Sequence, residues 1–382
     1  MKFEWQSRKI GDVVDIRRGA SPRPIHKFLA NVGMPWVKIA DATSDPSRYL
    51  WKTNEYIIDE GINKSVVVEP ETLIVSNSAT PGLPKIMKIR ACVHDGWLVF
   101  ANYRGITRDF LYYKFIDIRR KLVNQANGSV FQNLKTDIVK DFDIDIPSIR
   151  TQNRIVDILS KLDEKIELNS AINNNLEQQA QAIFKSWFID FEPFSNRKPR
   201  EWSVSTLGDV SIMGAGGDKP QNVSTIKTDL YEYPIYSNGL SNEGLYGFTD
   251  KPKISEESVT VSARGTIGFV FLRHIPYVPI VRLVTLIPNT EIISAKYLYL
   301  WLKQLHITGT GTTQQQLTVP DFQKTEILVP SQEIVALFTA TVEPIFEKIW
   351  ANQNENEKLS SLRDTLLPKL MSGELDVSDI EL

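Results

Sequence analysis

The chain has 382 residues, a formal net charge of −2, and hydrophobic and charged fractions of 42% and 24%. This composition is typical of a soluble globular protein, and the length favours two or three domains. The single cysteine, Cys92, excludes an internal disulfide framework. Because no apolar run is long enough for a membrane span and no secretory signal pattern opens the sequence, we expect a cytoplasmic protein.

Residues 1–150 are predicted to form a first β-rich domain. β-branched and aromatic runs bounded by turn residues, such as KSVVVEPETLIVSNS at 64–78, indicate strands, whereas residues 108–122 have the spacing of a short amphipathic helix. This segment holds 23 Lys and Arg against 17 Asp and Glu. Such an asymmetry can place a basic face behind a nearly neutral average.

A long helix is predicted over 151–191, then a short linker and a second β-rich domain over 192–330, then a second long helix with a C-terminal tail over 331–382. Apolar residues recur in both helices on two tracks three and four residues apart, which favours a coiled-coil seam over helices packed only on their own domains. The tracks comprise Ile155, Leu162, Leu176 and Ile183, with Leu159, Ile166, Ala180 and Trp187, and then Phe338, Ile345, Leu359 and Leu366, with Val335, Val342, Ile349 and Leu370.

The two halves of the chain repeat one another. The tetrapeptide IGDV at 10–13 returns as LGDV at 207–210, and EKI at 164–166 returns at 347–349. Each half has the same order, a β-rich stretch and then a long helix. We therefore predict an α+β fold with two β-rich domains, two long helices and a pseudo-twofold internal repeat.

Four asparagines interrupt the apolar seams near their midpoints: Asn169 and Asn173 in the first helix, Asn352 and Asn356 in the second. Buried amides pair with each other and penalise slipped registers, so we expect these four to fix the register of the helices. Parallel and antiparallel packing would both align them. In a parallel arrangement, the second domain would have to carry the chain back over the whole length of a helix to reach the start of the second helix. We therefore predict the antiparallel arrangement.

Two similar domains at the ends of a rigid spacer suit a target with two recognition points a fixed distance apart, and duplex DNA is the commonest such target. Four stretches then carry a family resemblance: IFKSWFIDFEPF at 183–194, LLPKLMSGELDV at 366–377, SARGTIGFV at 262–270 and GTGTTQQQL at 309–317. With the repeat order, they make the chain resemble, over essentially its full length, the DNA-specificity subunit of type I restriction–modification systems.

The resemblance implies two target-recognition domains that each read one half of a split DNA site. It implies that the helices set the unread gap and dock two methyltransferase subunits, and that restriction–translocase subunits join for cleavage. It also implies a subunit with no catalytic activity and no cofactor of its own, because S-adenosylmethionine, ATP and magnesium would be bound by the partner subunits.

The residues themselves offer no catalytic constellation. The sequence contains no G-x-x-x-x-G-K-[ST] phosphate loop and no Asn/Asp-Pro-Pro-aromatic methyltransferase motif. An acidic-acidic-lysine triplet at 163–165 lies on the first long helix, where charges are ordinarily solvated. The histidines show no i, i+4 pair, so we predict no metal site; they are His26, His94, His274 and His306.

Loops at matching places in the two domains hold candidate DNA contacts. Base reading needs two-pronged hydrogen bonding from Arg, Asn or Gln, and phosphate anchoring needs cations, hydroxyls and amides. Gly, Ser, Thr, Asn and Gln are also ordinary turn formers, which leaves a purely structural role open for each loop. The candidates are Arg17, Arg18, Lys38, Asn77, Ser78, Gln125, Asn127, Ser129, Gln132 and Asn133, with Arg23 beside them, in the first domain, and Lys219, Arg264, Thr266, Thr312, Thr313, Gln314 and Gln315 in the second.

Two alternatives remain open from the residues alone. The chain could be a coiled-coil adaptor that binds proteins and not DNA. The aromatic cluster that closes the first helix could pack under the second domain, form part of the methyltransferase dock, or do both; it comprises Trp187, Phe188, Phe191 and Phe194.

Overall fold

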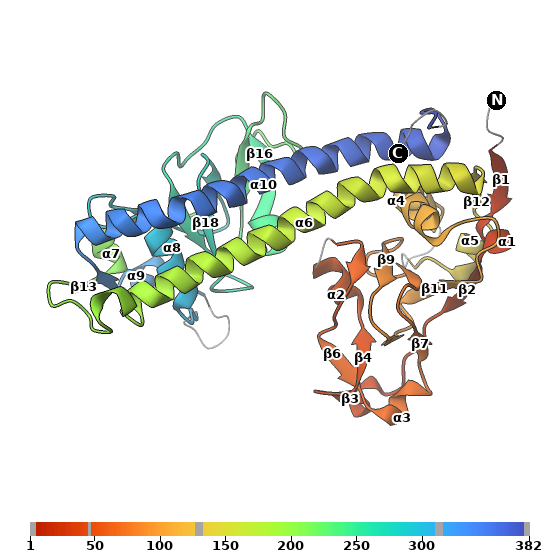
Figure 1. Ribbon diagram of the computed structural model, residues 1–382, viewed down its shortest axis with the longest axis horizontal. Helices are drawn as coiled ribbons and strands as arrows, with labels where there is room; N and C mark the ends of the chain where they lie inside the picture. The colour runs from red at the N-terminus through yellow and green to blue at the C-terminus, as the bar shows by residue number, and fades with distance from the viewer. Residues whose placement is uncertain (1–4, 45–46, 127–132, 310–315, 378–382) are drawn as a thin grey trace. The chain divides into compact units, whose positions relative to one another are not determined.

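The computed structural model describes residues 5–44, 47–126, 133–309 and 316–377 (Figure 1). Its contacts divide the chain into two compact units: unit 1 is 1–170 with 353–382, and unit 2 is 171–352. The two long helices, α6 (Ile149–Phe188) and α10 (Gln332–Ser372), each contribute one segment to each unit. The four-part division at residues 150, 191 and 330 therefore stays a prediction. Within the described residues, no helix is long and apolar enough to cross a membrane.

Unit 1 contains two five-stranded sheets, ordered β3-β6-β4-β10-β7 and β2-β11-β8-β9-β5, and the antiparallel pair β1-β12. Its strands are β1 (Gln6–Lys9), β2 (Asp15–Arg18), β3 (Leu29–Ala30), β4 (Met34–Val37), β5 (Tyr49–Leu50), β6 (Glu55–Ile57), β7 (Val66–Val68), β8 (Leu73–Ser76), β9 (Pro84–Met87), β10 (Ala91–Val93), β11 (Trp97–Ala101) and β12 (Asp143–Ile146). Its shorter helices are α1 (Ile10–Val13), η1 (Ile25–Lys27), α2 (Ile39–Ser44), α3 (Asp59–Ile62), α4 (Arg108–Ala126) and α5 (Thr136–Lys140).

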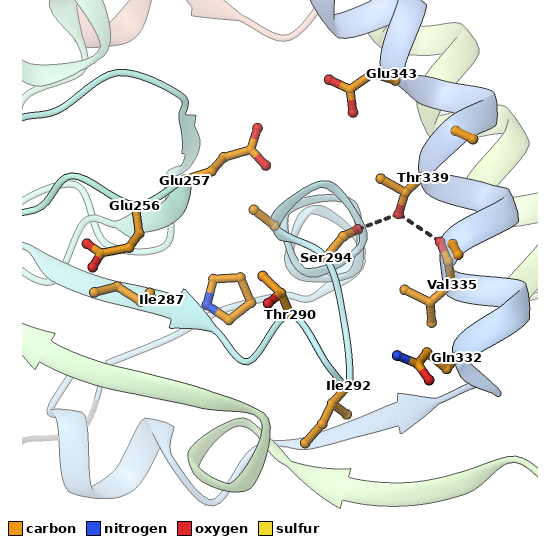
Figure 2. Close-up of a pocket in the computed structure, with 14 residues that line it drawn as sticks. Glu256, Glu257, Ile287, Thr290, Ile292, Ser294, Gln332, Val335, Thr339 and Glu343 are labelled. Atoms are coloured by element: carbon orange, nitrogen blue, oxygen red, sulfur yellow. Dashed lines mark hydrogen bonds between the residues drawn. The ribbon is translucent and has the colours of Figure 1, made fainter.

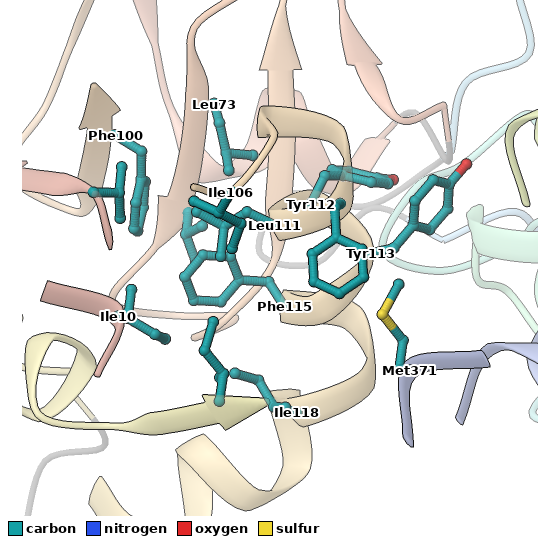
Figure 3. Close-up of a cluster of buried hydrophobic side chains, with 14 of the residues drawn as sticks. Ile10, Leu73, Phe100, Ile106, Leu111, Tyr112, Tyr113, Phe115, Ile118 and Met371 are labelled. Carbon is teal, nitrogen blue, oxygen red and sulfur yellow. The ribbon is translucent and has the colours of Figure 1, made fainter. Parts of the chain in front are cut away.

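The core of unit 1 lies where α4 packs against the sheet that contains β8 and β11 (Figure 3). Phe115 of α4 meets Phe100 of β11 edge to face, with ring centroids 5.0 Å apart. Ile155 of α6 and Met371 of α10 are buried in the same cluster. Each large apolar side chain buried here stabilises the fold by roughly 1.5–3 kcal/mol. The sheet is thereby joined to the segments of both long helices in this unit.

Unit 2 contains a four-stranded sheet ordered β14-β20-β17-β18, a three-stranded sheet ordered β16-β15-β19, and the antiparallel pair β13-β21. Its strands are β13 (Ser203–Thr206), β14 (Ser211–Ala215), β15 (Tyr233–Tyr236), β16 (Leu245–Thr249), β17 (Ser258–Val261), β18 (Val270–Arg273), β19 (Val278–Pro279), β20 (Val284–Pro288) and β21 (Glu326–Val329). Its shorter helices are η2 (Glu192–Phe194), α7 (Leu207–Val210), η3 (Ser241–Gly244), α8 (Ala295–Gln304) and α9 (Val319–Phe322).

The aromatic cluster at the end of α6 lies in the core of unit 2. Phe188 packs on Trp202 and on Phe338 of α10, with ring centroids 5.6 and 4.9 Å apart. Phe194 also contacts Trp202, at 4.9 Å. Packing under the second β-rich domain therefore accounts for this cluster, and it belongs to the same core as α8.

The two units repeat the same plan, as the duplicated sequence predicts. The sheet order β2-β11-β8-β9 in unit 1 corresponds to β14-β20-β17-β18 in unit 2. The first strands β1 and β13 directly precede the short helices α1 and α7, and each pairs with a strand near the end of its domain, β12 and β21. Helix α4 corresponds to α8. The α+β fold with an internal repeat is thus confirmed.

The α6 and α10 segments run antiparallel within each unit. In unit 1, Asp163 pairs with Arg363 at 2.8 Å, and Lys165 pairs with Glu355 at 3.4 Å. In unit 2, Asn173 accepts a hydrogen bond from Asn352. Phe184, which comes after Asn173 in α6, packs on Phe338, which comes before Asn352 in α10. In both cases the partner number on α10 falls as the number on α6 rises, so the helices have opposite directions.

Candidate nucleic-acid interface

The loop 76–82 in unit 1 is held by one serine. The Ser76 N–H donates to Leu83 O at 2.9 Å, and the Leu83 N–H donates back to the Ser76 hydroxyl oxygen at 3.0 Å. The Gly82 N–H donates to Ser76 O at 2.8 Å, and the Ser76 hydroxyl donates to Thr80 O. These four bonds close the loop on itself, so its shape comes from its own backbone and one hydroxyl.

The loop 262–268 in unit 2 has the same four bonds. The Ser262 N–H donates to Phe269 O at 2.9 Å, and the Phe269 N–H donates to the Ser262 hydroxyl oxygen at 2.9 Å. The Gly268 N–H donates to Ser262 O at 3.0 Å, and the Ser262 hydroxyl donates to Thr266 O. The two loops are therefore one structure built twice, and equivalent positions are 186 residues apart.

Both loops end on a glycine in the left-handed region, Gly82 at φ 76° and Gly268 at φ 89°. This conformation costs other L-residues about 1–2 kcal/mol, which explains the glycine at the same place twice. A side chain at Gly268 would also meet Ile307 O, a backbone atom, at 2.7 Å, whereas the nearest atoms to one at Gly82 belong to side chains, Arg119 at 3.0 Å and Val123 at 3.7 Å.

A second segment is attached to each loop by an equivalent backbone bond. The Leu134 N–H donates to Asn77 O at 2.8 Å, and the Leu317 N–H donates to Ala263 O at 3.0 Å. The described ends of the second predicted loops, at Leu134 and Leu317, are thereby held beside the first loops. Several candidates lie outside the described residues, namely Asn127, Ser129, Gln132, Thr312, Thr313, Gln314 and Gln315.

Arg264 and Ser78 occupy equivalent places at the tips of the two loops. Arg264 is exposed, and its Nε and Nη2 donate to Gln316 Oε1 at 3.0 and 2.8 Å. Thr266 is also exposed, with its hydroxyl directed to Asn238 O at 3.2 Å. Ser78 is half-buried. Gln125 and Asn133, the other described candidates of the first domain's loops, are exposed.

Asn77 does not lie where a base reader must lie. Its side chain is 4% exposed, and its Nδ2 donates to Asp95 O at 3.0 Å. Its equivalent in unit 2 is Ala263, which is fully buried. A reading role for Asn77 would require this amide to leave the interior, so that role stays a prediction, and Ser78 is the residue at the tip.

The basic side chains of the first domain are mostly paired with acceptors. Arg18 Nε donates to Asp95 O at 2.7 Å, Arg23 lies 3.2 Å from the Asp95 carboxylate, and Lys38 pairs with Glu55. Arg17, also in the first domain, donates to Val67 O, and Lys219, the predicted cation of the second domain besides Arg264, is exposed. Phosphate contact by Arg23 or Lys38 would therefore exchange one ionic partner for another.

His94 is linked to the loop 76–82 through Gly96. The Gly96 N–H donates to its Nδ1 at 2.8 Å, and Gly96 O accepts from the Asn77 N–H at 2.8 Å. Burial lowers the pKa of His94, against the opposing influence of Asp95. The neutral ring is thus the form that fits the bond from Gly96.

Sequence reasoning missed three residues that shape these loops: Asp95, Asn238 and Gln316. Asn238 Oδ1 accepts from the Ala263 N–H at 2.7 Å, and its Nδ2 donates to Val281 O at 2.7 Å. Asn238 and Asp95 stand far along the chain from the loops they support, so no local motif could have marked them. Gln316 directly follows the predicted Gln314 and Gln315, and that glutamine run was the available signal.

The four register asparagines form two hydrogen-bonded pairs, one in each unit. In unit 1, Asn169 Nδ2 donates to Asn356 Oδ1 at 2.9 Å and to Glu355 at 2.8 Å. In unit 2, Asn352 Nδ2 donates to Asn173 Oδ1 at 2.8 Å. Asn169 and Asn352, which are equivalent in the repeat, are each 1% exposed. Each pair thus joins one buried amide to one half-buried amide, Asn356 in unit 1 and Asn173 in unit 2, and the register-setting role stays a prediction.

Two cavities differ in their relation to the loops. One of about 860 Å³ in unit 1 is lined by Ser78, Arg23, Lys38 and His94 among others. One of about 640 Å³ in unit 2 lies between Glu256, Glu257 and the first turns of α10, where Thr339 donates to Ser294 (Figure 2). Carboxylates rim the second cavity, and none of the described candidate DNA contacts lines it, so of these two cavities the first is the one that adjoins the candidate interface.

Among the described residues, no group of three or more His, Cys, Asp or Glu side chains could hold a metal ion. The chain thus has two β-rich domains, each with one hydrogen-bonded loop of the same structure and each packed on segments of α6 and α10. This arrangement is that of a protein with two recognition domains. The family model described as the type I restriction modification DNA specificity domain matches residues 2–178 and 199–360. The chain belongs to this family.

Relatives of the chain carry the same assignment. The specificity subunit of the type I restriction enzyme MjaIX of Methanocaldococcus jannaschii is 27% identical over 99% of this chain and 95% of that protein. A putative type I specificity subunit of Mycoplasma pneumoniae is 30% identical over 68% of this chain and 78% of that protein. The crystal structure of a type I system S subunit from M. genitalium covers 98% of this chain and 97% of its own at a TM-score of 0.57 and 17% identity, a likeness of fold.

The chain is thus a DNA specificity subunit of a type I restriction–modification system, the non-catalytic subunit of that complex. The adaptor alternative, which lacked a DNA role, is set aside by this membership. The match in two segments also follows the internal repeat.

Proposed function

We propose that each β-rich domain reads one half of a bipartite DNA site through its framed loop. The observation that carries this proposal is the pair of loops 76–82 and 262–268, which share one hydrogen-bonded frame but present different side chains. A constant frame with a variable tip suits the reading of two different half-sites, since base contacts specify and backbone contacts position.

The tip and neighbouring side chains then have separate roles. Arg264, Thr266 and Lys219 would contact DNA in the second half-site, and Ser78 with Arg17 in the first. Gln125 and Asn133, both exposed, extend the first contact surface. The candidates outside the described residues stay proposed DNA contacts of their own domains. Hydroxyls and cations anchor phosphates, while Arg and amides read base edges.

The helices α6 and α10 would set the unread gap between the half-sites, with the asparagine pairs fixing their register. Two methyltransferase subunits would dock along them, and restriction–translocase subunits would join for cleavage. S-adenosylmethionine, ATP and magnesium would be bound by those partners in the cytoplasm. The paired cations of the first domain leave little local charge for phosphates, so the partners would also supply much of the grip on DNA.

Mapping of N6-methyladenine across the genome of a host tests this function. The host carries the methyltransferase subunit with or without this chain. We expect one bipartite motif, two short half-sites separated by a gap of fixed length, to be methylated only when the chain is present. A continuous motif, or an unchanged methylome, would contradict the proposal.

A further inference from the structure

Arg264 is held in one orientation by a neutral side chain from a distant part of the sequence. Its Nε and Nη2 both donate to Gln316 Oε1, at 3.0 and 2.8 Å. Gln316 is itself fixed beside the loop, because the next residue, Leu317, donates its N–H to Ala263 O. The guanidinium plane is thereby set by two contacts from the segment that adjoins the loop.

The bonds to Gln316 use one edge of the guanidinium and leave the other. Nε and Nη2 form the side edge, so the end edge, which pairs Nη1 with Nη2, keeps its parallel N–H donors. Arg264 is exposed and makes no other hydrogen bond to a described residue. Two parallel donors on one edge match two acceptors on a planar partner.

The charge of Arg264 is also uncompensated. No described carboxylate lies within the 4.0 Å of an ion pair from it, whereas Arg23 lies 3.2 Å from Asp95 and Arg104 lies 2.8 Å from Asp15. An amide orients the guanidinium without neutralising it. A cation that is fixed in place and keeps its full charge gains more on approach to DNA than one that must first leave a carboxylate.

We propose that Gln316 is a positioning residue that presents the end edge of Arg264 to a guanine in the major groove of the second half-site. This inference rests on the function proposed above and deepens it by naming the base. Guanine O6 and N7 are the two acceptors that an arginine edge matches, and no other base presents two acceptors there. Arg264 supplies the contact, and Gln316 acts through Arg264.

The equivalent positions of the first domain do not hold an arginine and a glutamine. Ser78 stands in place of Arg264, and Asn133 stands in place of Gln316. One hydroxyl cannot donate two parallel bonds, so the tip of the first loop has no equivalent guanine contact. The proposal therefore concerns one half-site only.

The test uses the assembled complex and its recognised duplex, with 7-deazaguanine placed at each guanine in turn to remove the N7 acceptor. We expect one position in the second half-site to weaken wild-type binding about tenfold, and to have little effect on the Arg264→Ala complex. Gln316→Ala should show reduced sensitivity at the same position. Gln304→Ala, an exposed glutamine on α8, is the matched control and should keep wild-type sensitivity.

A double-mutant cycle separates positioning from direct contact. If Gln316 acts through Arg264, the double variant binds the recognised duplex as Arg264→Ala does, within about twofold. Losses that multiply would overturn the positioning role, as would an absence of any guanine whose N7 matters only when Arg264 is present. Both outcomes leave a bipartite motif intact, whereas failure of the proposed function would abolish the motif itself. Equal melting temperatures of the variants exclude unfolding as the cause.

Discussion

The loops 76–82 and 262–268 have the same backbone hydrogen bonds but different side chains at their tips. Each closes through a serine hydroxyl and a left-handed glycine, and each receives one N–H bond from a second segment. One tip presents Ser78, whereas the other presents Arg264 held by Gln316. The comparison shows which atoms the two loops share, namely those of the serine, the glycine and the backbone bonds, and which differ, namely the side chains at the tips.

The supports behind the loops differ as well. Gly96, which is bonded to the ring of His94, accepts the Asn77 N–H in unit 1. The side chain of Asn238 accepts the equivalent Ala263 N–H in unit 2. The equivalent backbone N–H groups thus donate to a main-chain carbonyl oxygen in one domain and to a side-chain amide oxygen in the other. The two recognition surfaces can therefore be perturbed separately.

Glycine replacement gives the largest expected difference between the loops. Gly268→Ala places a Cβ 2.7 Å from Ile307 O, a backbone atom, in addition to the strain of a φ of 89°. Gly82→Ala has a similar strain at a φ of 76°, but the nearest atoms that its Cβ meets belong to side chains, Arg119 Cγ at 3.0 Å and Val123 Cγ2 at 3.7 Å. We expect discrimination of the second half-site to fall about tenfold or more in Gly268→Ala, and that of the first to fall by less than about fivefold in Gly82→Ala.

The measurement is the affinity of the assembled complex for the recognised duplex against duplexes with one half-site scrambled. Equal losses in the two variants would show that backbone clearance does not distinguish the loops.

Acid should weaken the first loop more than the second. The folded state favours neutral His94, because burial lowers its pKa below the ordinary 6.5. Its contribution is complete above pH 6.5 and is lost as the pH falls through the lowered pKa, since protonated Nδ1 can no longer accept the Gly96 N–H. Over a titration that starts above pH 6.5 and goes down through the lowered pKa of His94, discrimination of the first half-site should decline, and that of the second should not.

Half-site discrimination measured across this range checks the prediction, with the exposed His26→Gln as control. His94→Phe should remove the pH dependence. Parallel decline at both half-sites would place the titrating group elsewhere.

Replacement of Asn77 should have the smallest effect. Asn77→Ala removes one bond to Asp95 O together with a buried Oδ1 that has no partner among the described residues, and it installs the residue found at the equivalent Ala263. We expect the stability to change by no more than about 1 kcal/mol. Half-site discrimination should change by less than about threefold. A selective loss at the first half-site would restore Asn77 as a reader.

The large-scale fold could be predicted because it rests on patterns that are local or repeated. The seven-residue tracks predicted a helix over 151–191 and a helix with a C-terminal tail over 331–382, and the structure has α6 at Ile149–Phe188 and α10 at Gln332–Ser372. The offset repeat predicted the duplicated sheets. Arg264 and Thr266, in a recognisable motif, were found at an exposed tip.

The details of the site could not be predicted, because they depend on which way each side chain points and on contacts between distant residues. Asn77 lies in a polar loop sequence, yet the loop frame turns its side chain inward. Gln316 meets Arg264 across 52 residues of sequence. No spacing rule connects such positions until the bond between Leu317 and Ala263 has been seen.

Site-specific photocrosslinking tests the central claim most directly. A photoreactive amino acid replaces Ser78 in one chain and Thr266 in another, and each assembled complex is irradiated on a duplex that carries the recognised sequence. The account predicts that position 78 crosslinks to one half-site and position 266 to the other, with the intervening gap unlabelled. Crosslinks from both positions to the same half-site, or from neither to the recognised bases, would contradict it.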